Sequence, residues 1–182
     1  MRIRLRFMAA FLISLASRIS SADVARVTSS GFLIRHEMDV AAPPAKVFDS
    51  LKQVGSWWNP AHTFSGVAKN LFIEARPGGC FCERLRNGGG VEHMRVVYIA
   101  PDEVIRMTGA LGPLQSSGVA GSLTWTLTST SNGSKILLTY SAGGFMEGGF
   151  EAIAPAADAM LGEQLQRLKT FVETGSPTPA AH

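Results

Sequence analysis

Apolar and polar residues alternate along several stretches of the chain, and this two-residue period predicts β-strands. Residues 32–40 and 122–129 show the period most clearly, with large apolar side chains on one face. Turn signals such as Asn132-Gly133 separate the stretches and favour tight hairpins. The other strands are predicted over residues 71–75, 80–86, 91–99, 104–111 and 135–141. Together they form an antiparallel meander, which must bury one face.

Helical spacing appears at the two sides of this meander. Leucines 161, 165 and 168 and Val172 form one apolar stripe, which predicts a long amphipathic helix over about 155–173, ended by Gly175. Two short helices are predicted over residues 44–51 and 55–60. The resulting fold is α+β, with a curved antiparallel sheet of six or seven strands around the C-terminal helix. A curved sheet cannot close fully on one helix, so we expect a cavity between them.

The first 22 residues have a different pattern. Arg2, Arg4 and Arg6 precede an apolar run over residues 7–16, as in a secretory signal peptide. That run is about half the ~20 residues of a transmembrane helix. Cleavage is expected after Ala22, with Ala16 as the alternative site, and a mitochondrial-type transit peptide is the alternative function of the segment. We therefore expect a periplasmic or secreted protein that is not inserted in the membrane after cleavage.

Composition and charge change this picture in two ways. The 182 residues are 46% apolar and 17% charged, which suits one folded domain, expected over residues 23–175, followed by an unstructured tail over 176–182. The net charge of +3 comes from the four arginines of residues 1–22, and the remaining 13 bases and 14 acids leave −1. We therefore expect no nucleic-acid partner. Two cysteines exclude a disulfide-stapled scaffold.

Several short motifs, in order, give the chain a resemblance to a known superfamily. They are residues 40–51 (VAAPPAKVFDSL), Trp57-Trp58, Pro77-Gly78-Gly79, Leu123-Thr124-Trp125, residues 133–138 and the closing helix. In this order they resemble the START/SRPBCC superfamily over about residues 31–175, and specifically its polyketide-cyclase and heat-shock ATPase-activator-homologue branch. The resemblance implies a helix-grip fold around an apolar pocket. Cys80 departs from the arginine common at that position, and the functions of this superfamily are diverse.

The candidate ligand-binding residues lie on the presumed inner strand faces, in the tryptophan pair, in a glycine-rich loop and on the last helix. They are His36, Met38, Trp57, Trp58, Cys80, Cys82, His93, Met107, Trp125, Tyr140, Phe145 and Met160. Three of these, His36, His93 and Tyr140, supply the polar anchors of a mostly apolar pocket. Each histidine can equally be a buried side chain with a local hydrogen bond, or a proton-transfer group.

The two cysteines lie two residues apart, so their thiols share one side of a strand. We interpret them as two small apolar side chains lining the core or cavity, with a local disulfide and a metal site with His93 as the alternatives. Glu83, Glu92 and Arg95 are expected on a solvated strand face, and the alternative is that they supply charge near the two histidines of the pocket.

No phosphate-binding loop, nucleophile elbow or zinc-protease motif occurs in the sequence, so no catalytic residue, cofactor or metal ion is assigned. The leading hypothesis is an exported protein that holds a small apolar molecule. One alternative is a cyclase/dehydratase- or hydrolase-type enzyme in the same cavity, for which an inward-facing pair of polar groups would be the sign. The other is a protein-interaction module like the ATPase-activator homologues.

Overall fold

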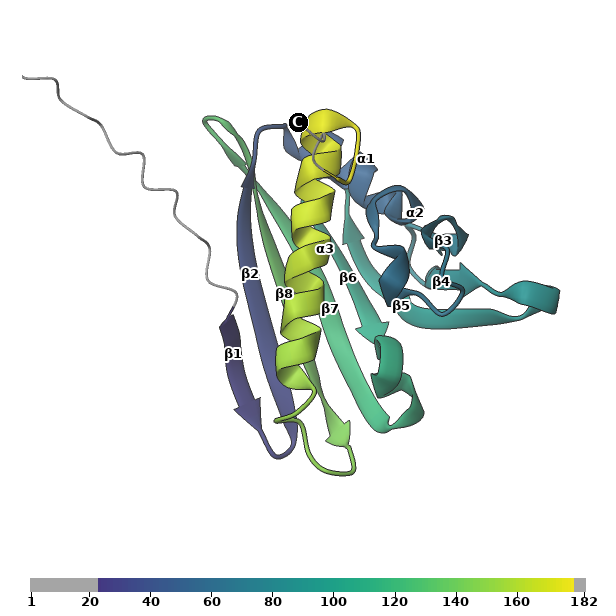
Figure 1. Cartoon of the computed structure of the whole chain (residues 1–182). Coiled ribbons are helices and arrows are strands. Elements are labelled where there is room, and N and C mark those ends of the chain that lie inside the picture. The colour runs from purple at the N-terminus through teal and green to yellow at the C-terminus, as the bar shows by residue number, and fades with distance from the viewer. Residues whose placement is uncertain (1–22, 179–182) are drawn as a thin grey trace, which may run out of the picture.

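The computed structural model describes residues 23–178, which fold around a single eight-stranded antiparallel sheet (Figure 1). Its spatial order is β1-β2-β8-β7-β6-β5-β4-β3. The strands are β1 (Asp23–Thr28), β2 (Gly31–Val40), β3 (Leu71–Ile73), β4 (Cys80–Arg84), β5 (Gly90–Ala100), β6 (Val104–Gly109), β7 (Gly118–Thr130) and β8 (Gly133–Phe145). All six predicted meander strands are present, in the predicted antiparallel arrangement.

The strand that sequence analysis missed is β1, which forms one edge of the sheet beside β2. Its pairing shifts register between Val24 and Arg26, so the segment has no clean alternation that could have indicated it. The number of strands is therefore eight rather than six or seven.

Three α-helices accompany the sheet: α1 (Pro44–Lys52), α2 (Val54–Trp57) and α3 (Ala154–Thr174). Short 3₁₀ helices lie at Pro60–His62, Ala68–Asn70, Arg86–Gly88 and Gly112–Ser116. Helix α3 runs along one face of the sheet and comes nearest to β2, while α1 and α2 lie near the C-terminal end of α3 (Figure 1). Pro155 lies in the first turn of α3, where a backbone N–H would have no acceptor within the helix, so the N–H that proline lacks is not missed. Gly175 ends it in the left-handed conformation, with φ of 81°.

The main core lies between α3 and the inner face of the sheet. Leu161, Leu165 and Leu168 of the predicted stripe are buried against inward residues such as Ile34 and Leu138. Full burial of each such side chain stabilises the fold by roughly 1.5–3 kcal/mol. This packing covers one part of the inner face of the sheet, and another part of that face stays uncovered by α3.

One polar contact also joins α3 to the sheet within this core. His36 Nε2 of β2 lies 2.9 Å from Asp158 Oδ1 of α3, although the two atoms are not aligned for a hydrogen bond. Gly162, one turn further along α3, makes room for the ring, since a Cβ there would lie 3.2 Å from His36 Cε1. The glycine therefore allows close approach of an imidazole, at the usual cost of glycine within a helix.

The predicted signal peptide, residues 1–22, and the last four residues of the predicted tail, 179–182, lie outside the described residues. Within residues 23–178, none of the helices combines the length and the apolar character needed to cross a lipid bilayer.

Candidate functional site

A cavity of about 470 Å³ opens between the sheet, the start of α3 and the segment that follows α2. This volume is within the usual range for small-molecule sites, roughly 300–1,000 Å³. Most of its lining is apolar, and the residues concerned are Trp58, Ala61, Phe64, Leu71, Phe81, Leu111, Gly112, Pro113, Leu114, Ile153, Ala156, Ala157 and Met160. The polar side chains in the lining are His62, Thr63, His93 and Tyr140.

His93 reaches the cavity because β5 carries a β-bulge at this residue. Phe81 pairs with Met94 and Cys82 pairs with Glu92, so His93 is an extra residue without a partner in β4. The bulge turns His93 and Met94 inward together, and both are buried. Gly109 of β6 makes room for the bulged backbone, since a Cβ at position 109 would lie 2.6 Å from the His93 carbonyl oxygen.

Beside this ring lies a buried carboxylate. Glu83 Oε2 is 3.1 Å from His93 Nε2, and Glu83 is only 1% exposed. The same carboxylate accepts hydrogen bonds from the backbone N–H groups of Phe64, at 3.1 Å, and Ser65. Burial raises the pKa of Glu83, but hydrogen bonds from Ser65, Phe64 and His93 outweigh it, so the pKa is lowered from 4.5. Glu83 is therefore ionised at neutral pH.

The protonation of His93 follows from this neighbour. Burial lowers the pKa of His93 from 6.5, and the charge of Glu83 opposes this without reversing it. An ionised carboxylate only accepts hydrogen bonds, so the neutral ring carries its proton on Nε2. Nδ1 then bears a lone pair. Among residues 23–178 it has no hydrogen-bond partner, and it is not one of the polar atoms sealed from solvent.

Tyr140 of β8 brings a second neutral polar group to the cavity. Its hydroxyl oxygen accepts a hydrogen bond from the Leu111 N–H at 3.3 Å, and burial raises its pKa to about 12. The hydroxyl proton has no acceptor among the described residues, so it is free to be donated to a ligand.

The segment that contributes one wall of the cavity, residues 59–65, is fixed at both ends by polar contacts. On the α3 side, the Asn59 N–H donates to Gln164 Oε1 at 2.8 Å, and His62 Nε2 lies 3.1 Å from Glu163 Oε2. On the sheet side, Glu83 holds Phe64 and Ser65 as described above. Glu83 therefore orients His93 and positions one wall of the cavity.

Four of the predicted ligand-binding residues line this cavity: Trp58, His93, Tyr140 and Met160. Trp57, Met107 and Trp125 are instead buried in the core, where Trp57 packs edge-on against Trp125. His36 and Met38 lie further along β2, where His36 contacts α3. Phe145, at the end of β8, is 77% exposed and also outside the lining. Alternation assigns these side chains to a face, but the cavity occupies only part of that face.

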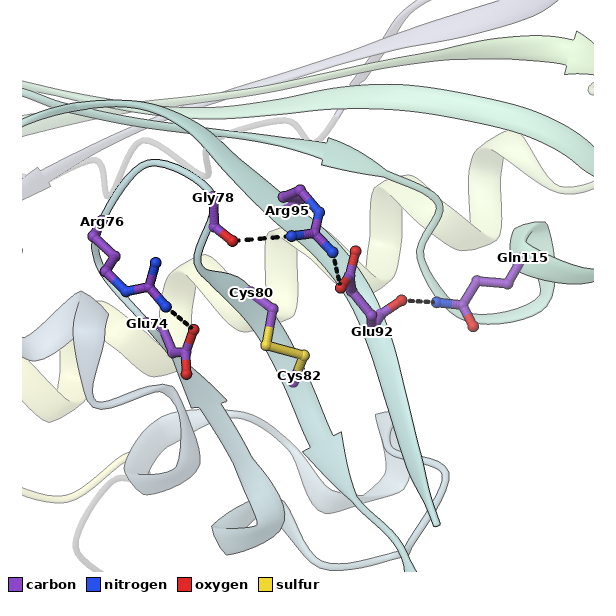
Figure 2. Close-up of a disulfide and its surroundings, with 8 residues drawn as sticks. All are labelled: Glu74, Arg76, Gly78, Cys80, Cys82, Glu92, Arg95 and Gln115. Atoms are coloured by element: carbon purple, nitrogen blue, oxygen red, sulfur yellow. Dashed lines mark hydrogen bonds and ion pairs between the residues drawn. A yellow bond between two sulfur atoms is a disulfide. The ribbon is translucent and has the colours of Figure 1, made fainter.

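The interpretation of Cys80 and Cys82 as two free apolar side chains is wrong. The two residues form a disulfide, the alternative considered for them, and both lie outside the cavity lining (Figure 2). Alternation along β4 explains their position, because Phe81 and Glu83 face inward and the cysteines face outward. The Glu74–Arg76 and Glu92–Arg95 ion pairs flank the disulfide on the outer side.

Glu83 is the polar residue of the site that sequence analysis placed wrongly. It was expected on a solvated face with Glu92 and Arg95, and only these two are exposed. The sequence did contain a signal for its position. Glu83 lies two residues after Phe81, so both side chains face the same side of the strand, and a large apolar side chain such as Phe81 is expected to face inward. The walls formed by residues 61–64 and 153–157 had no such signal. Among the described residues, no three histidine, cysteine or acidic side chains gather in a way that could hold a metal ion.

Comparison of the whole chain with solved structures shows the same fold in several bacterial proteins. A protein of Mesorhizobium loti is 20% identical, with a TM-score of 0.57 over 77% of this chain and 96% of that one. The Aha1 dimer of Colwellia psychrerythraea is 21% identical, with a TM-score of 0.56 over 79% and 97%. At these identities the likeness concerns the fold alone.

A third structure is a protein from the dynemicin biosynthetic locus, which is 18% identical with a TM-score of 0.57. The match covers 80% of this chain and 48% of that larger one. No curated protein matches this sequence. The family described as polyketide cyclase/dehydrase and lipid transport matches residues 32–173, which span the sheet from β2 to β8 and nearly all of α3. This protein therefore belongs to that family, within the START/SRPBCC superfamily.

Proposed function

We propose that this protein binds one small, uncharged and largely apolar molecule in the cavity between β4, β5, β8 and α3. The observation that carries the proposal is the cavity itself, with its mostly apolar lining. Removing apolar ligand surface from water contributes roughly 25 cal/mol per Å² before the costs of association.

The state of the two buried polar groups supports an uncharged ligand. Tyr140 and His93 are both neutral at neutral pH, for the reasons given above. An ionised ligand group would lose its hydration without meeting an opposite charge on either of them, which is costly. A ligand carbonyl or hydroxyl could instead accept the Tyr140 proton, and a hydroxyl could donate to His93 Nδ1.

The binding test uses the neutral fluorescent dye N-phenyl-1-naphthylamine. Met160→Arg puts a long charged side chain into the lining and is expected to abolish dye uptake. Met38→Arg is the matched control, because Met38 is also half-buried but lies outside the cavity. Equal uptake by the two folded variants would remove the cavity from consideration.

We also propose that the protein is exported from the cytoplasm. The arginine-rich and apolar start of the sequence supports this, as does the Cys80–Cys82 disulfide, since disulfides persist in oxidising compartments. Cell fractionation followed by N-terminal sequencing tests it. Export predicts an envelope or secreted form that begins at Asp23, or at Ser17 if the alternative site is used, whereas a cytoplasmic protein that begins at Met1 would contradict it.

A further inference from the structure

We infer that the Cys80–Cys82 disulfide is a redox site, which takes two electrons from the thiols of a partner molecule. This inference goes beyond the proposed binding function and does not depend on it, because the disulfide lies on the outer face of the sheet and outside the cavity lining. Three features of the disulfide carry it: the short spacing of the cysteines, their partial exposure and the charged side chains beside them (Figure 2).

The disulfide is not placed where it could hold separate parts of the fold together. It joins two residues of β4, and this strand is already paired with β3 on one side and β5 on the other. Closing a loop with one intervening residue restricts the unfolded chain only weakly. Reduction leaves the strand pairing intact, since the ladders on both sides of β4 use backbone groups. The oxidised and the reduced protein therefore share the same fold.

Both cysteines are partly exposed to solvent. Phe81 between them points the other way, is buried and lines the cavity. Thiol–disulfide exchange requires a thiolate to reach the sulfur that it attacks, so a disulfide that solvent reaches is open to exchange and a sealed one is protected. The alternation along β4 thus places a reactive bond on one face of the strand and a binding wall on the other.

The bulge in β5 places a cation beside one cysteine and an anion beside the other. Arg95 is the cross-strand partner of Cys80, and Glu92 is the cross-strand partner of Cys82. Side chains three residues apart in a regular strand point to opposite faces. Because His93 is an extra residue between them, Glu92 and Arg95 both face outward, next to the disulfide (Figure 2).

Two contacts hold the guanidinium group of Arg95 in this position. Its Nη1 donates to the Gly78 carbonyl oxygen at 3.0 Å, and its Nη2 donates to Glu92 Oε2 at 2.6 Å. A neighbouring cation favours the thiolate form of a cysteine, and a neighbouring carboxylate disfavours it. When the disulfide breaks, the negative charge is therefore better placed on Cys80 than on Cys82. This difference makes Cys80 the leaving group.

The reaction consists of two successive exchanges. A thiolate of the partner attacks Cys82 Sγ, the bond to Cys80 breaks, and Cys80 Sγ keeps the electron pair as a thiolate. A second thiolate, from the same partner or from another molecule of a small thiol, then attacks the partner's sulfur in this mixed disulfide and releases Cys82. Overall the partner thiols lose two electrons and two protons and form a disulfide, and the two cysteines gain both. The same steps in reverse, with a disulfide as the oxidant, restore the site.

The test mixes the oxidised protein with a synthetic peptide that carries two cysteines and, in a separate reaction, with reduced glutathione. Mass spectrometry after alkylation counts the free thiols of the protein and of the probe over time. The protein is expected to oxidise at least one probe about 10-fold faster than bis(2-hydroxyethyl) disulfide, an uncharged linear disulfide, at the same concentration. A faster reaction with the peptide indicates a polypeptide partner, and a faster reaction with glutathione indicates a small thiol. Rates with both probes that do not exceed those of the reference disulfide overturn the redox site.

A pair of arginine variants tests the role of the charge beside Cys80. Arg95→Gln removes this cation and should lower the oxidation rate about 10-fold. Arg35→Gln is the matched control, because Arg35 is similarly exposed and also pairs with a glutamate of its own strand, but that strand is β2. Equal rates in the two variants would overturn the role of Arg95 as a positioning residue.

Single-cysteine variants test which sulfur leaves. Cys82→Ser retains the Cys80 thiol, and Cys80→Ser retains the Cys82 thiol. At neutral pH the Cys80 thiol should react with iodoacetamide about 10-fold faster, since Arg95 favours its thiolate. Equal rates, or a faster reaction of the Cys82 thiol, would overturn the assignment of Cys80 as the leaving group.

Two further outcomes separate this inference from the binding function. The reduced protein should keep the circular dichroism spectrum of the oxidised one, and loss of that spectrum would overturn the redox site because the disulfide would then be a structural link. Dye uptake by a protein that fails the oxidation test leaves the binding function standing. Oxidation of a probe by a protein that takes up no dye supports the redox site and counts against the binding function alone.

Discussion

Three histidine–carboxylate pairs occur among residues 23–178, and they differ in their surroundings. His36–Asp158 and His93–Glu83 are buried, whereas His62–Glu163 is about 40% exposed on both sides. Water screens the last pair, so it adds little stability. In the buried pairs, removal of one side chain leaves the other polar side chain buried without its partner, which is costly.

This difference predicts unequal costs for the same substitution. His36→Leu leaves the buried carboxylate of Asp158 facing an apolar side chain and should lower the free energy of unfolding by about 3 kcal/mol. His62→Leu, the matched control, should cost about 0–1 kcal/mol. Urea denaturation of both variants measures the two values. Equal costs would show that the His36 contact contributes no more than an exposed pair.

The second prediction at the residue scale concerns pH. Because the folded state lowers the pKa of His93 from 6.5, the unfolded chain binds this proton first, so stability falls as pH drops below about 6.5. Glu83 acts in the same direction at lower pH, since its lowered pKa stabilises the fold above about 4.5 and this contribution is lost on protonation.

The measurement compares urea midpoints at pH 7.5 and 5.0. The unsubstituted protein should have the lower midpoint at pH 5.0, and His93→Gln should show a smaller difference between the two conditions. The His62→Leu variant should retain most of the pH dependence. A pH dependence that is the same with and without the His93 imidazole would contradict the assignment of a neutral buried ring.

At the scale of elements, alternation and helical spacing were enough to predict β2 to β8 and α3 because each of these elements buries one face. They could not predict the bulges. Strand β5 carries extra residues at His93 and Val97, and each one changes which side chains face inward beyond it. No local pattern of residues indicates where a strand will gain such a residue. For this reason the cavity wall was less predictable than the fold.

Strand β4 gives the prediction at this scale. Only Phe81 separates the bonded cysteines, and closing so short a loop constrains the unfolded chain weakly, so reduction should lower the free energy of unfolding by about 1.5 kcal/mol. Because both cysteines lie outside the lining, dye affinity should stay unchanged. Urea denaturation and dye titration with and without a phosphine reductant measure both effects. Release of the dye on reduction would contradict the outward position of the disulfide.

At the scale of the whole molecule, the cavity combines segments far apart in the chain: the stretch after α2, strands β4, β5 and β8, and the start of α3. The resemblance to the superfamily predicted a pocket between sheet and helix, and the cavity lies there. Its particular walls depend on how far α3 covers the sheet and on the contacts of residues 59–65, and these are properties of the folded chain.

Ligand binding should therefore stabilise these distant segments together. At a free dye concentration of 100 times Kd, linkage predicts a gain of about 2.7 kcal/mol in the free energy of unfolding. Amide hydrogen exchange should slow in residues 58–64, in 111–114 and in the first turns of α3, and should not change in the β1–β2 hairpin. Protection confined to that hairpin would show that the dye binds elsewhere.

The extra residue at position 93 of β5 shows how the chemistry of such a cavity can change between related proteins. Deleting His93 would restore one-to-one pairing with β4 and remove the imidazole, while the strands, the helix and nearly all of the composition would remain. Shifting the irregularity by one position would turn an acidic or basic neighbour, Glu92 or Arg95, toward the hollow. A single-codon deletion can thus remove a binding group from the cavity, and a deletion paired with a neighbouring insertion can replace it with another, while the scaffold stays the same.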